Sequence, residues 1–451
     1  MKKYLSYILL LQLSFWACKK AEVDPLFGET ANTRTTTVID GYKKQLTSAE
    51  YGWKGEYYTN GGDGVGYSFY LKFDATGKVS MYSDIDGFYY FTNGYDKAFE
   101  STYQVKALQK PTLIFDSYSY MHELVNPDYN GGPGQVADLE LEVSTASDSK
   151  ITFVGVKNKT ALTLTKVTKT ESDLLTKGLL GTNVKSVNNI TNYLVLTLPS
   201  GTKTDVILDL EKKQLGLLTF DKQGNPIVTS SSFVTTATGL KLQNAISVDG
   251  SSFDEVLYDE TLKSYYVMIG GKRYNITASL RPSLSFYDAL GILFVGFDMN
   301  PAIPTQTAEY KALYTRIRNN VIALSTAAPA RVIGNVYLQY LPSDGTFVLV
   351  VEYRRTNTDG SLLFNGAAVF YYQPSLDAKG NLSFGKPFQT ATLSGGQLSA
   401  GASGIVAAGI KPLTDVIENN TFTWDFDTVE PKAALLKSNG TPSISIKGTL
   451  F

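Results

Sequence analysis

The residue best placed to do chemistry is the single cysteine of the chain, Cys18. It follows an apolar run, residues 5–17, which itself follows the positively charged start at residues 1–3. The run is shorter than the roughly 20 apolar residues that cross a bilayer, and it has the layout of a secretory signal. A small residue directly before a cysteine at the end of such a run resembles the processing site of bacterial lipoproteins. We therefore expect removal of residues 1–17 and acylation of Cys18; the alternative is an ordinary secretory signal.

Acylation at Cys18 would make the membrane a partner of the mature protein. Each buried CH₂ of a fatty acyl chain such as palmitate contributes about 0.8 kcal/mol, and two chains give stable anchoring. Residues 18–33 are polar and predict a tether. Glu22 and Asp24 within it resemble the export signal of surface lipoproteins in the Bacteroidetes. We expect a lipid-anchored outer-membrane protein exposed at the surface, with a periplasm-facing location as the alternative.

Two segments, 84–97 and 118–132, combine aromatic residues with Gly and Asn turn residues. Aromatic rings on exposed loops stack on sugars or anchor a protein partner, where Tyr is favoured. The alternative is that these rings cover a barrel opening and bury one another. The candidate ligand-binding residues are Phe88, Tyr89, Tyr90, Phe91, Tyr95, Tyr118, Tyr120 and Tyr129.

Residues for catalysis and metal binding are scarce. The one histidine, His122, makes most histidine-based catalysis unexpected, and we place it on a strand as a packed residue. Carboxylates pair locally, as in Asp254 and Glu255, but a glycosidase needs two carboxyl groups about 5–9.5 Å apart in one cleft. Solvated turns are the better explanation of these pairs. We expect no catalytic residue, no cofactor and no metal.

Nucleic acid is not an expected partner, because 41 Lys and Arg residues nearly balance 42 Asp and Glu residues. A nucleic-acid-binding domain normally carries a basic excess.

The elements that must position these residues are mainly β-strands. Tyr (29) and Phe (23) are abundant, and such residues favour strands. Many segments alternate apolar and polar residues, which indicates antiparallel sheets with one polar face. Asn-Gly and Asp-Gly pairs recur between them and favour tight hairpins. The sequence predicts antiparallel barrels or sandwiches, each preceded by a short amphipathic helix, at residues 36–48, 170–180 and 307–321.

A repeated D-x-x-G turn, at Asp74, Asp221 and Asp377, agrees with three units of similar length. We draw a β unit at 34–168, a second at 169–284 and an α+β unit at 285–451. In the first unit, Gly52-Trp53 opens the first strand, and we expect Trp53 to plug one end of a barrel. The predicted strands lie near 53–59, 66–73, 78–83, 100–106, 112–116, 118–124, 138–144, 150–156 and 160–166.

The layout of residues 34–260 resembles a family of Bacteroidetes outer-membrane lipoproteins that carry a domain of unknown function (DUF4302), with a lipocalin-like first part. The matching stretches include residues 51–58, 70–73, 101–103, 111–116, 153–160 and 233–248. Residues 156–159 are a loose version of the Gly-Lys-Lys-Thr stretch of this family. The family has no assigned activity, and its members look like accessories of outer-membrane import systems.

The function that these observations favour is binding without catalysis. We expect an accessory lipoprotein that captures a glycan or a peptide beside an outer-membrane transport complex. A structural, adhesin-like surface protein is the alternative, and a hydrolase of unknown substrate is a third.

Overall fold

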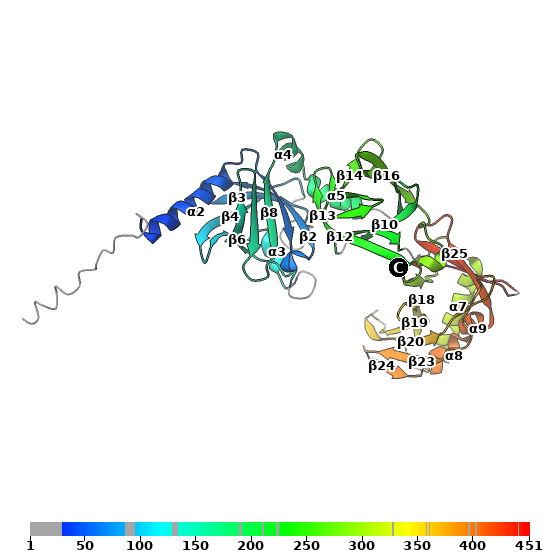
Figure 1. The fold of residues 1–451 in the computed structure, drawn as a ribbon. Helices are drawn as coiled ribbons and strands as arrows, with labels where there is room; N and C mark the ends of the chain where they lie inside the picture. The colour runs from blue at the N-terminus through cyan, green and yellow to red at the C-terminus, as the bar shows by residue number, and fades with distance from the viewer. Residues whose placement is uncertain are drawn as a thin grey trace, which may run out of the picture. The chain divides into compact units, whose positions relative to one another are not determined.

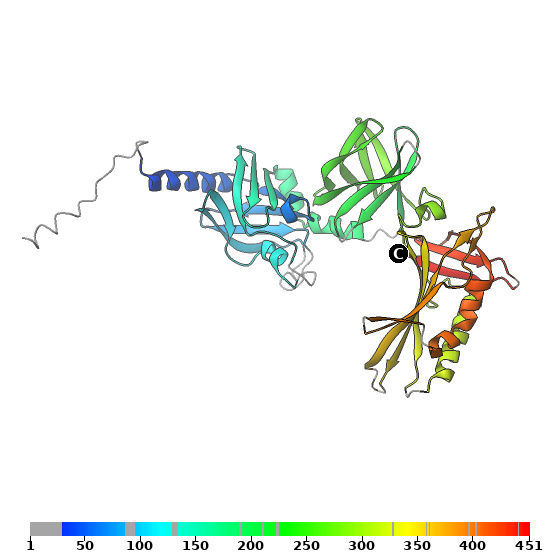
Figure 2. The same cartoon turned by 60° about the horizontal axis from the view of Figure 1, so that its bottom comes forward.

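The computed structural model describes residues 29–85, 95–128, 134–188, 192–209, 212–221, 225–326, 329–357, 359, 361–395, 397–401, 404–440 and 442–451, without the side chains of 184–188 and 362–364. The chain forms two compact units, Met1–Thr182 and Asn183–Phe451. The fold is mainly β, as predicted, with two closed antiparallel barrels and an 11-stranded sheet (Figures 1 and 2). The division into three units stays a prediction. No helix within the described residues is long and apolar enough to cross a membrane.

The first compact unit contains a closed barrel that runs up and down in sequence order, with its first strand paired to its last. Its interior is filled by large side chains, among them Tyr57, Phe69 and Phe115, which are almost completely buried. The strands are β1 (Trp53–Tyr58), β2 (Gly66–Phe73), β3 (Lys78–Ser83), β4 (Phe99–Ala107), β5 (Pro111–Phe115), β6 (Glu140–Ala146), β7 (Lys150–Gly155) and β8 (Ala161–Lys166).

Helix α2 (Ala31–Thr47) precedes this barrel, where the amphipathic stripe predicts a helix. Thr30 caps it, because its hydroxyl accepts a hydrogen bond from the backbone N–H of Thr33. The indole N–H of Trp53 donates to the Leu46 carbonyl at 2.8 Å, near the end of α2. Trp53 is fully buried in the barrel core, which agrees with the plugging role predicted for it.

Residues 118–124 are not a strand, which corrects our prediction. They include most of helix α3 (Tyr120–Val125), and His122 therefore lies on a helix. Tyr120, Met121 and Leu124 are buried, the i, i+1, i+4 spacing of a helical face, whereas strand alternation would put Met121 on the opposite face from the other two. The barrel has no place for another strand here, because β5 pairs directly with β6, with Leu113 opposite Leu141.

The predicted helix at 170–180 is two helices, α4 (Lys169–Leu175) and α5 (Leu179–Asn188). The break falls at Gly178, whose φ of 77° lies in the left-handed region that favours glycine.

The second compact unit begins with another closed eight-stranded barrel. Its core consists of aliphatic side chains with one buried ring from Phe233 and another from Phe253. Its strands are β9 (Tyr193–Thr197), β10 (Lys203–Asp209), β11 (Gln214–Phe220), β12 (Pro226–Thr236), β13 (Gly239–Val248), β14 (Ser251–Asp259), β15 (Ser264–Ile269) and β16 (Lys272–Ser279).

The 11-stranded sheet follows in the same unit, in the order β21-β22-β25-β26-β27-β17-β18-β19-β20-β23-β24. The helices and strands of this part of the chain are α6 (Phe286–Ala289), β17 (Gly296–Asp298), α7 (Ala308–Leu324), β18 (Val332–Leu341), β19 (Thr346–Thr356), β20 (Leu362–Tyr372), β21 (Ser375–Leu376), β22 (Leu382–Ser383), β23 (Gln389–Ser394), β24 (Gln397–Ala400), α8 (Gly404–Gly409), α9 (Lys411–Asn419), β25 (Thr421–Phe426), β26 (Ala433–Ser438) and β27 (Ser445–Leu450).

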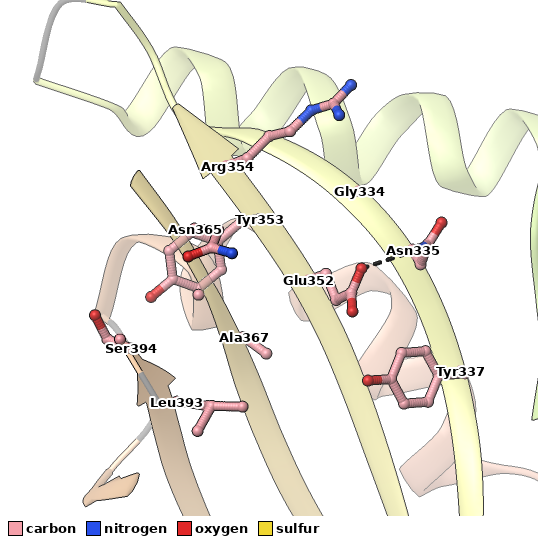
Figure 3. A pocket seen from close by; sticks show the side chains of 12 residues that line it. Gly334, Asn335, Tyr337, Glu352, Tyr353, Arg354, Asn365, Ala367, Leu393 and Ser394 are labelled. Carbon is pink, nitrogen blue, oxygen red and sulfur yellow. Dashed lines mark hydrogen bonds between the residues drawn. The ribbon is translucent and has the colours of Figure 1, made fainter. Parts of the chain in front are cut away.

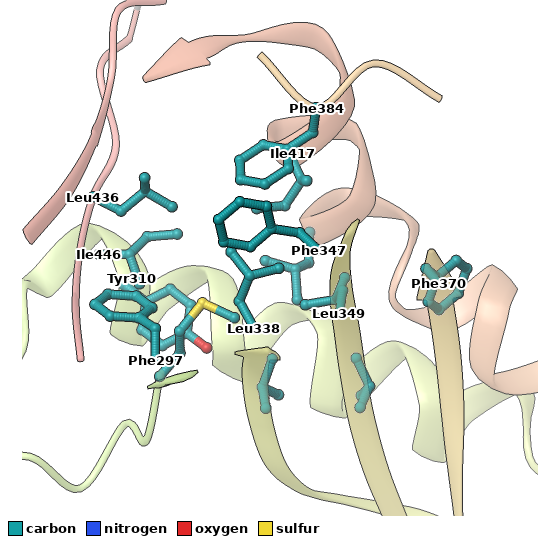
Figure 4. Close-up of a cluster of buried hydrophobic side chains, with 14 of the residues drawn as sticks. Phe297, Tyr310, Leu338, Phe347, Leu349, Phe370, Phe384, Ile417, Leu436 and Ile446 are labelled. Carbon is teal, nitrogen blue, oxygen red and sulfur yellow. The ribbon is translucent and has the colours of Figure 1, made fainter. Parts of the chain in front are cut away.

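Helices α7 and α9 lie side by side along one face of this sheet (Figures 1 and 2). The stripe Tyr310, Leu313, Ile317 and Val321 of α7 is buried there, as its spacing predicts. Rings and aliphatic side chains from α7, α9 and the strands form the core between them (Figure 4). The opposite face of the sheet has its own small apolar cluster around Val348, Val350 and Val369.

Candidate functional site

Six of the predicted site residues lie outside the described part of the chain. They are Cys18, Phe88, Tyr89, Tyr90, Phe91 and Tyr129. The other three, Tyr95, Tyr118 and Tyr120, belong to the first compact unit.

These three tyrosines have different surroundings. Tyr120 is buried against the Phe99 ring, with centroids 5.8 Å apart, and burial raises its pKa to about 12. Tyr95 lies against α5, where a Cβ at Gly181 would meet its ring at 2.0 Å. Tyr118 is 37 % exposed and stacks on the half-buried His122 ring at 5.5 Å. Burial lowers the pKa of His122, and its Nδ1 lies 3.0 Å from the Ser119 hydroxyl.

The stretch 155–160, which carries part of the family resemblance, is built around the buried carboxylate of Asp138. Its oxygens accept hydrogen bonds from the backbone N–H groups of Lys157 and Asn158 and from the Thr160 hydroxyl, at 2.9 to 3.0 Å. Gly155 leaves room for this carboxylate, since a Cβ there would lie 2.0 Å from Asp138 Oδ2. These contacts hold one end of the first barrel together and use most of the acceptor capacity of Asp138.

The cavity described inside the second barrel is small. The cavity inside it has a volume of about 10 Å³ and is lined by aliphatic side chains and Tyr265. That is at the lower limit for one water molecule. This cavity is therefore too small for a lipocalin-like ligand.

A larger pocket, of about 450 Å³, lies on the C-terminal sheet where β18, β19, β20 and β23 run side by side (Figure 3). The pocket is within the size range of small-molecule sites. The residues that line it are Gly334, Asn335, Tyr337, Glu352, Tyr353, Arg354, Asn365, Gly366, Ala367, Leu393, Ser394 and Gly395.

A β-bulge shapes one wall of the pocket. The register between β18 and β19 shifts between Ile333 and Val336, so that Gly334 and Asn335 leave the regular ladder. Bulges of this kind redirect a side chain and are common beside functional sites. Tyr314 of α7 supports the bulge, because its hydroxyl donates to the Gly334 carbonyl at 2.8 Å. The Asn335 amide in turn donates to Glu352 Oε2 at 3.0 Å (Figure 3).

A close approach between β20 and its neighbours shapes the opposite wall. A Cβ at Gly366 would lie 2.7 Å from the Leu393 carbonyl and 3.0 Å from the ring of Tyr353. Only glycine allows both contacts, so Gly366 lets β19, β20 and β23 come together beneath the pocket.

The charge in the pocket centres on Glu352. Burial raises the pKa of Tyr337, and the neighbouring negative charge of Glu352 raises it further. Asp298, which pairs with Tyr337 across β17 and β18, also has a raised pKa, mainly through burial and then through Glu352. Among the lining residues Glu352 is the one carboxylate and Arg354 the one cation.

A second hollow, of about 470 Å³, lies in the first compact unit between α2, the β2–β3 turn and β4. Lys43 and Lys44 line it and are exposed, and no carboxylate lines it. The hydroxyl of Tyr103, which also lines it, already donates to the Asp74 carbonyl. This hollow lacks the converging polar side chains of the pocket on the C-terminal sheet.

Sequence reasoning missed this pocket, although part of its signal is in the sequence. Gly334-Asn335 interrupts an alternating strand, and Glu352 and Arg354 are the polar members of another. Isolated Gly in a strand suggests a bulge or a close backbone approach. Which strands lie side by side, however, depends on pairing between segments distant in sequence.

The described residues contain no group of three or more His, Cys, Asp and Glu side chains that could hold a metal ion. The family model described as "Domain of unknown function (DUF4302)" matches residues 23–260. No curated protein matches the chain.

Proposed function

The chain belongs to the family of the domain of unknown function DUF4302, and from this premise we propose that it is a lipid-anchored envelope protein that binds a glycan without cleaving it. The family match ends at residue 260, before the pocket on the C-terminal sheet. The support for binding therefore comes from the pocket itself.

The observation that carries the proposal is a pocket of about 450 Å³ that is lined by several planar polar groups and has a single carboxylate among its lining residues. The amides of Asn335 and Asn365, the carboxylate of Glu352 and the guanidinium of Arg354 each offer paired donors or acceptors. Such groups match the neighbouring hydroxyls of a sugar ring. Tyr337 adds a partly buried aromatic ring beside them.

Hydrolysis is the weaker candidate, because a glycosidase uses two carboxyl groups at one bond. Glu352 lines the pocket, whereas Asp298 does not line it. A peptide ligand and an adhesin-like role are outcomes that the binding experiment separates from glycan capture.

The proposal also states where the protein is located. Acylation at Cys18, an outer-membrane position and a role beside a nutrient import system rest on the lipoprotein-like start of the sequence and on its resemblance to Bacteroidetes lipoproteins. A binding protein tethered in this way would concentrate its ligand near the importer.

Glycan binding is tested with the purified protein on an array of polysaccharides and oligosaccharides, followed by calorimetry with the ligands retained. We expect Glu352→Gln to lower the affinity at least tenfold, since it removes the charge while keeping the shape. The matched control is Glu255→Gln, an exposed carboxylate on β14. Thermal melting of each variant checks the fold.

Other results would overturn the proposal. Equal glycan affinity of the parent and Glu352→Gln would show that this pocket is not the glycan-binding site. Shortened oligosaccharides after incubation would establish a hydrolase. Retention of peptides in place of glycans would change the ligand class.

A further inference from the structure

Strand β12 of the second barrel (Figure 1) has one half with a free edge. Its residues Phe233–Thr236 pair with β13, and the hydroxyl of the buried Ser231 still accepts a hydrogen bond from the Asn244 N–H of β13, whereas residues 226–230 pair with β11 alone among the described residues. The register of β13 shifts after Lys241, and its last residues pair with β14. Residues 226–230 are all exposed. The barrel closes through the second half of β12, and the first half of β12, residues 226–230, extends beyond its pairing with β13.

The free edge presents a defined set of backbone groups. Asp221 N–H donates to the Asn225 carbonyl, and Phe233 N–H donates to the Lys213 carbonyl, which fixes the hydrogen-bonded pairs at both ends of the β11–β12 ladder. Because such pairs alternate in an antiparallel ladder, the odd-numbered residues of β12 bond to β11. The N–H and C=O groups of Val228 and Ser230 therefore point outward, together with the C=O group of Pro226.

The side chains along this edge favour contact with another neutral strand. Phe220, Ile227 and Val228 are 49 %, 45 % and 43 % exposed. Neither β11 nor β12 contains a charged residue. Proteins commonly protect exposed strand edges with Lys or other charges, and this edge has no such protection.

We propose that the free edge of β12 pairs with the same edge of a second copy of this chain, antiparallel and centred on Val228. Each Val228 N–H then donates to the Val228 carbonyl of the other copy. Each Ser230 N–H donates to the Pro226 carbonyl of the other copy. Pro226 has no N–H group, so no outward donor of residues 226–230 is left unpaired.

A second copy fits this edge because the edge is complementary to itself. A two-fold axis through Val228 closes the assembly at two copies. It sets Val228 opposite Val228 and Ile227 opposite Thr229, pairs of β-branched residues that stabilise antiparallel sheets. The absence of charge removes repulsion between the like strands. Anchoring in one membrane, as in the proposed function, would raise the effective concentration of the copies, although the pairing itself does not depend on the anchor.

The test is sedimentation equilibrium of the full chain in mild detergent, where we expect a monomer–dimer equilibrium. Val228→Pro removes an N–H group that points away from β11, so the barrel ladder stays intact. Val228→Lys places two positive charges opposite each other. We expect both changes to raise the dimer dissociation constant at least tenfold. Met268→Lys is the control, because Met268 is exposed on β15, a strand paired on both sides.

A cross-link locates the contact. In the Cys18→Ser background, Val228→Cys should give a covalent dimer on oxidation, since directly opposed Cα atoms lie about 5.5 Å apart, within disulfide range. Leu262→Cys, at an exposed site in the β14–β15 turn, should not.

Two results would overturn the proposal. If the parent protein stays monomeric at 100 µM, a second copy of the chain does not bind this edge, even if another polypeptide does. A dimer that tolerates both Val228 substitutions would exclude this edge. Glycan binding by Val228→Lys, measured in parallel, separates failure of the pairing from failure of the proposed function.

Discussion

At the scale of single residues, two carboxylates differ in how many hydrogen-bond donors surround them, and this decides whether each stabilises the fold or can still bind a ligand. Asp138 is buried, and its oxygens accept hydrogen bonds from the backbone N–H groups of Lys157, Asn158 and Thr160 and from the Thr160 hydroxyl. Glu352 lines a pocket and contacts the Asn335 amide and Tyr337. A carboxylate has about four acceptor sites. Asp138 has little capacity left for a ligand, whereas Glu352 keeps some.

Asp138→Asn tests the structural role. The amide turns one acceptor into a donor that faces backbone donors, and it removes charge-assisted bonds worth about 1.5–3 kcal/mol each. We expect the free energy of unfolding to fall by about 2–3 kcal/mol in urea titrations. The control, Asp173→Asn, removes half of an exposed i,i+4 pair with Lys169, for which about 0.5 kcal/mol is expected. Equal effects of the two changes would contradict the role assigned to Asp138.

At the scale of elements, the sequence predicts secondary structure best where apolar residues keep one spacing, helical or alternating, over a long segment. The stripe of α7 identifies its helix and its buried face. The run around Met121 is too short for its periodicity to be decisive, and we predicted a strand where the chain forms α3. The pocket on the C-terminal sheet could not be predicted at all. It depends on a bulge at Gly334 and on the pairing of Gly366 with Tyr353, which are set by distant segments.

The bulge also gives an element-scale prediction. Tyr314→Phe removes the hydroxyl that bonds to the Gly334 carbonyl, so Asn335 should lose its fixed position beside Glu352. We expect glycan affinity to fall three- to tenfold, with a loss of about 1 kcal/mol in stability. Tyr310→Phe is the matched control on the same helix, since its buried hydroxyl has no hydrogen-bond partner among the described residues. Unchanged affinity in Tyr314→Phe, measured by calorimetry, would show that the bulge does not position the site.

At the scale of the whole molecule, size and composition predict several β units without saying which one carries the site. The second barrel is packed and leaves a cavity of about 10 Å³, whereas the C-terminal sheet has the pocket of about 450 Å³. Trp53 and the stretch around Asp138, which lie in the segment with the family resemblance, make hydrogen bonds that stabilise the first barrel. The proposed binding site thus lies outside the segment that the family model matches.

The proposed membrane anchor concerns the whole molecule, because it would decide where every other part works. In the proposal the acyl chains on Cys18 are the attachment, and two chains anchor stably where one gives only marginal binding. We expect Cys18→Ser to move from the membrane fraction to the soluble fraction of the expressing cells. Radiolabelled palmitate should enter the parent and not the variant. Limited proteolysis of both proteins checks that the fold is unchanged. A Cys18→Ser protein that stays with the membrane after a high-pH wash, while still folded, would exclude lipidation as its attachment.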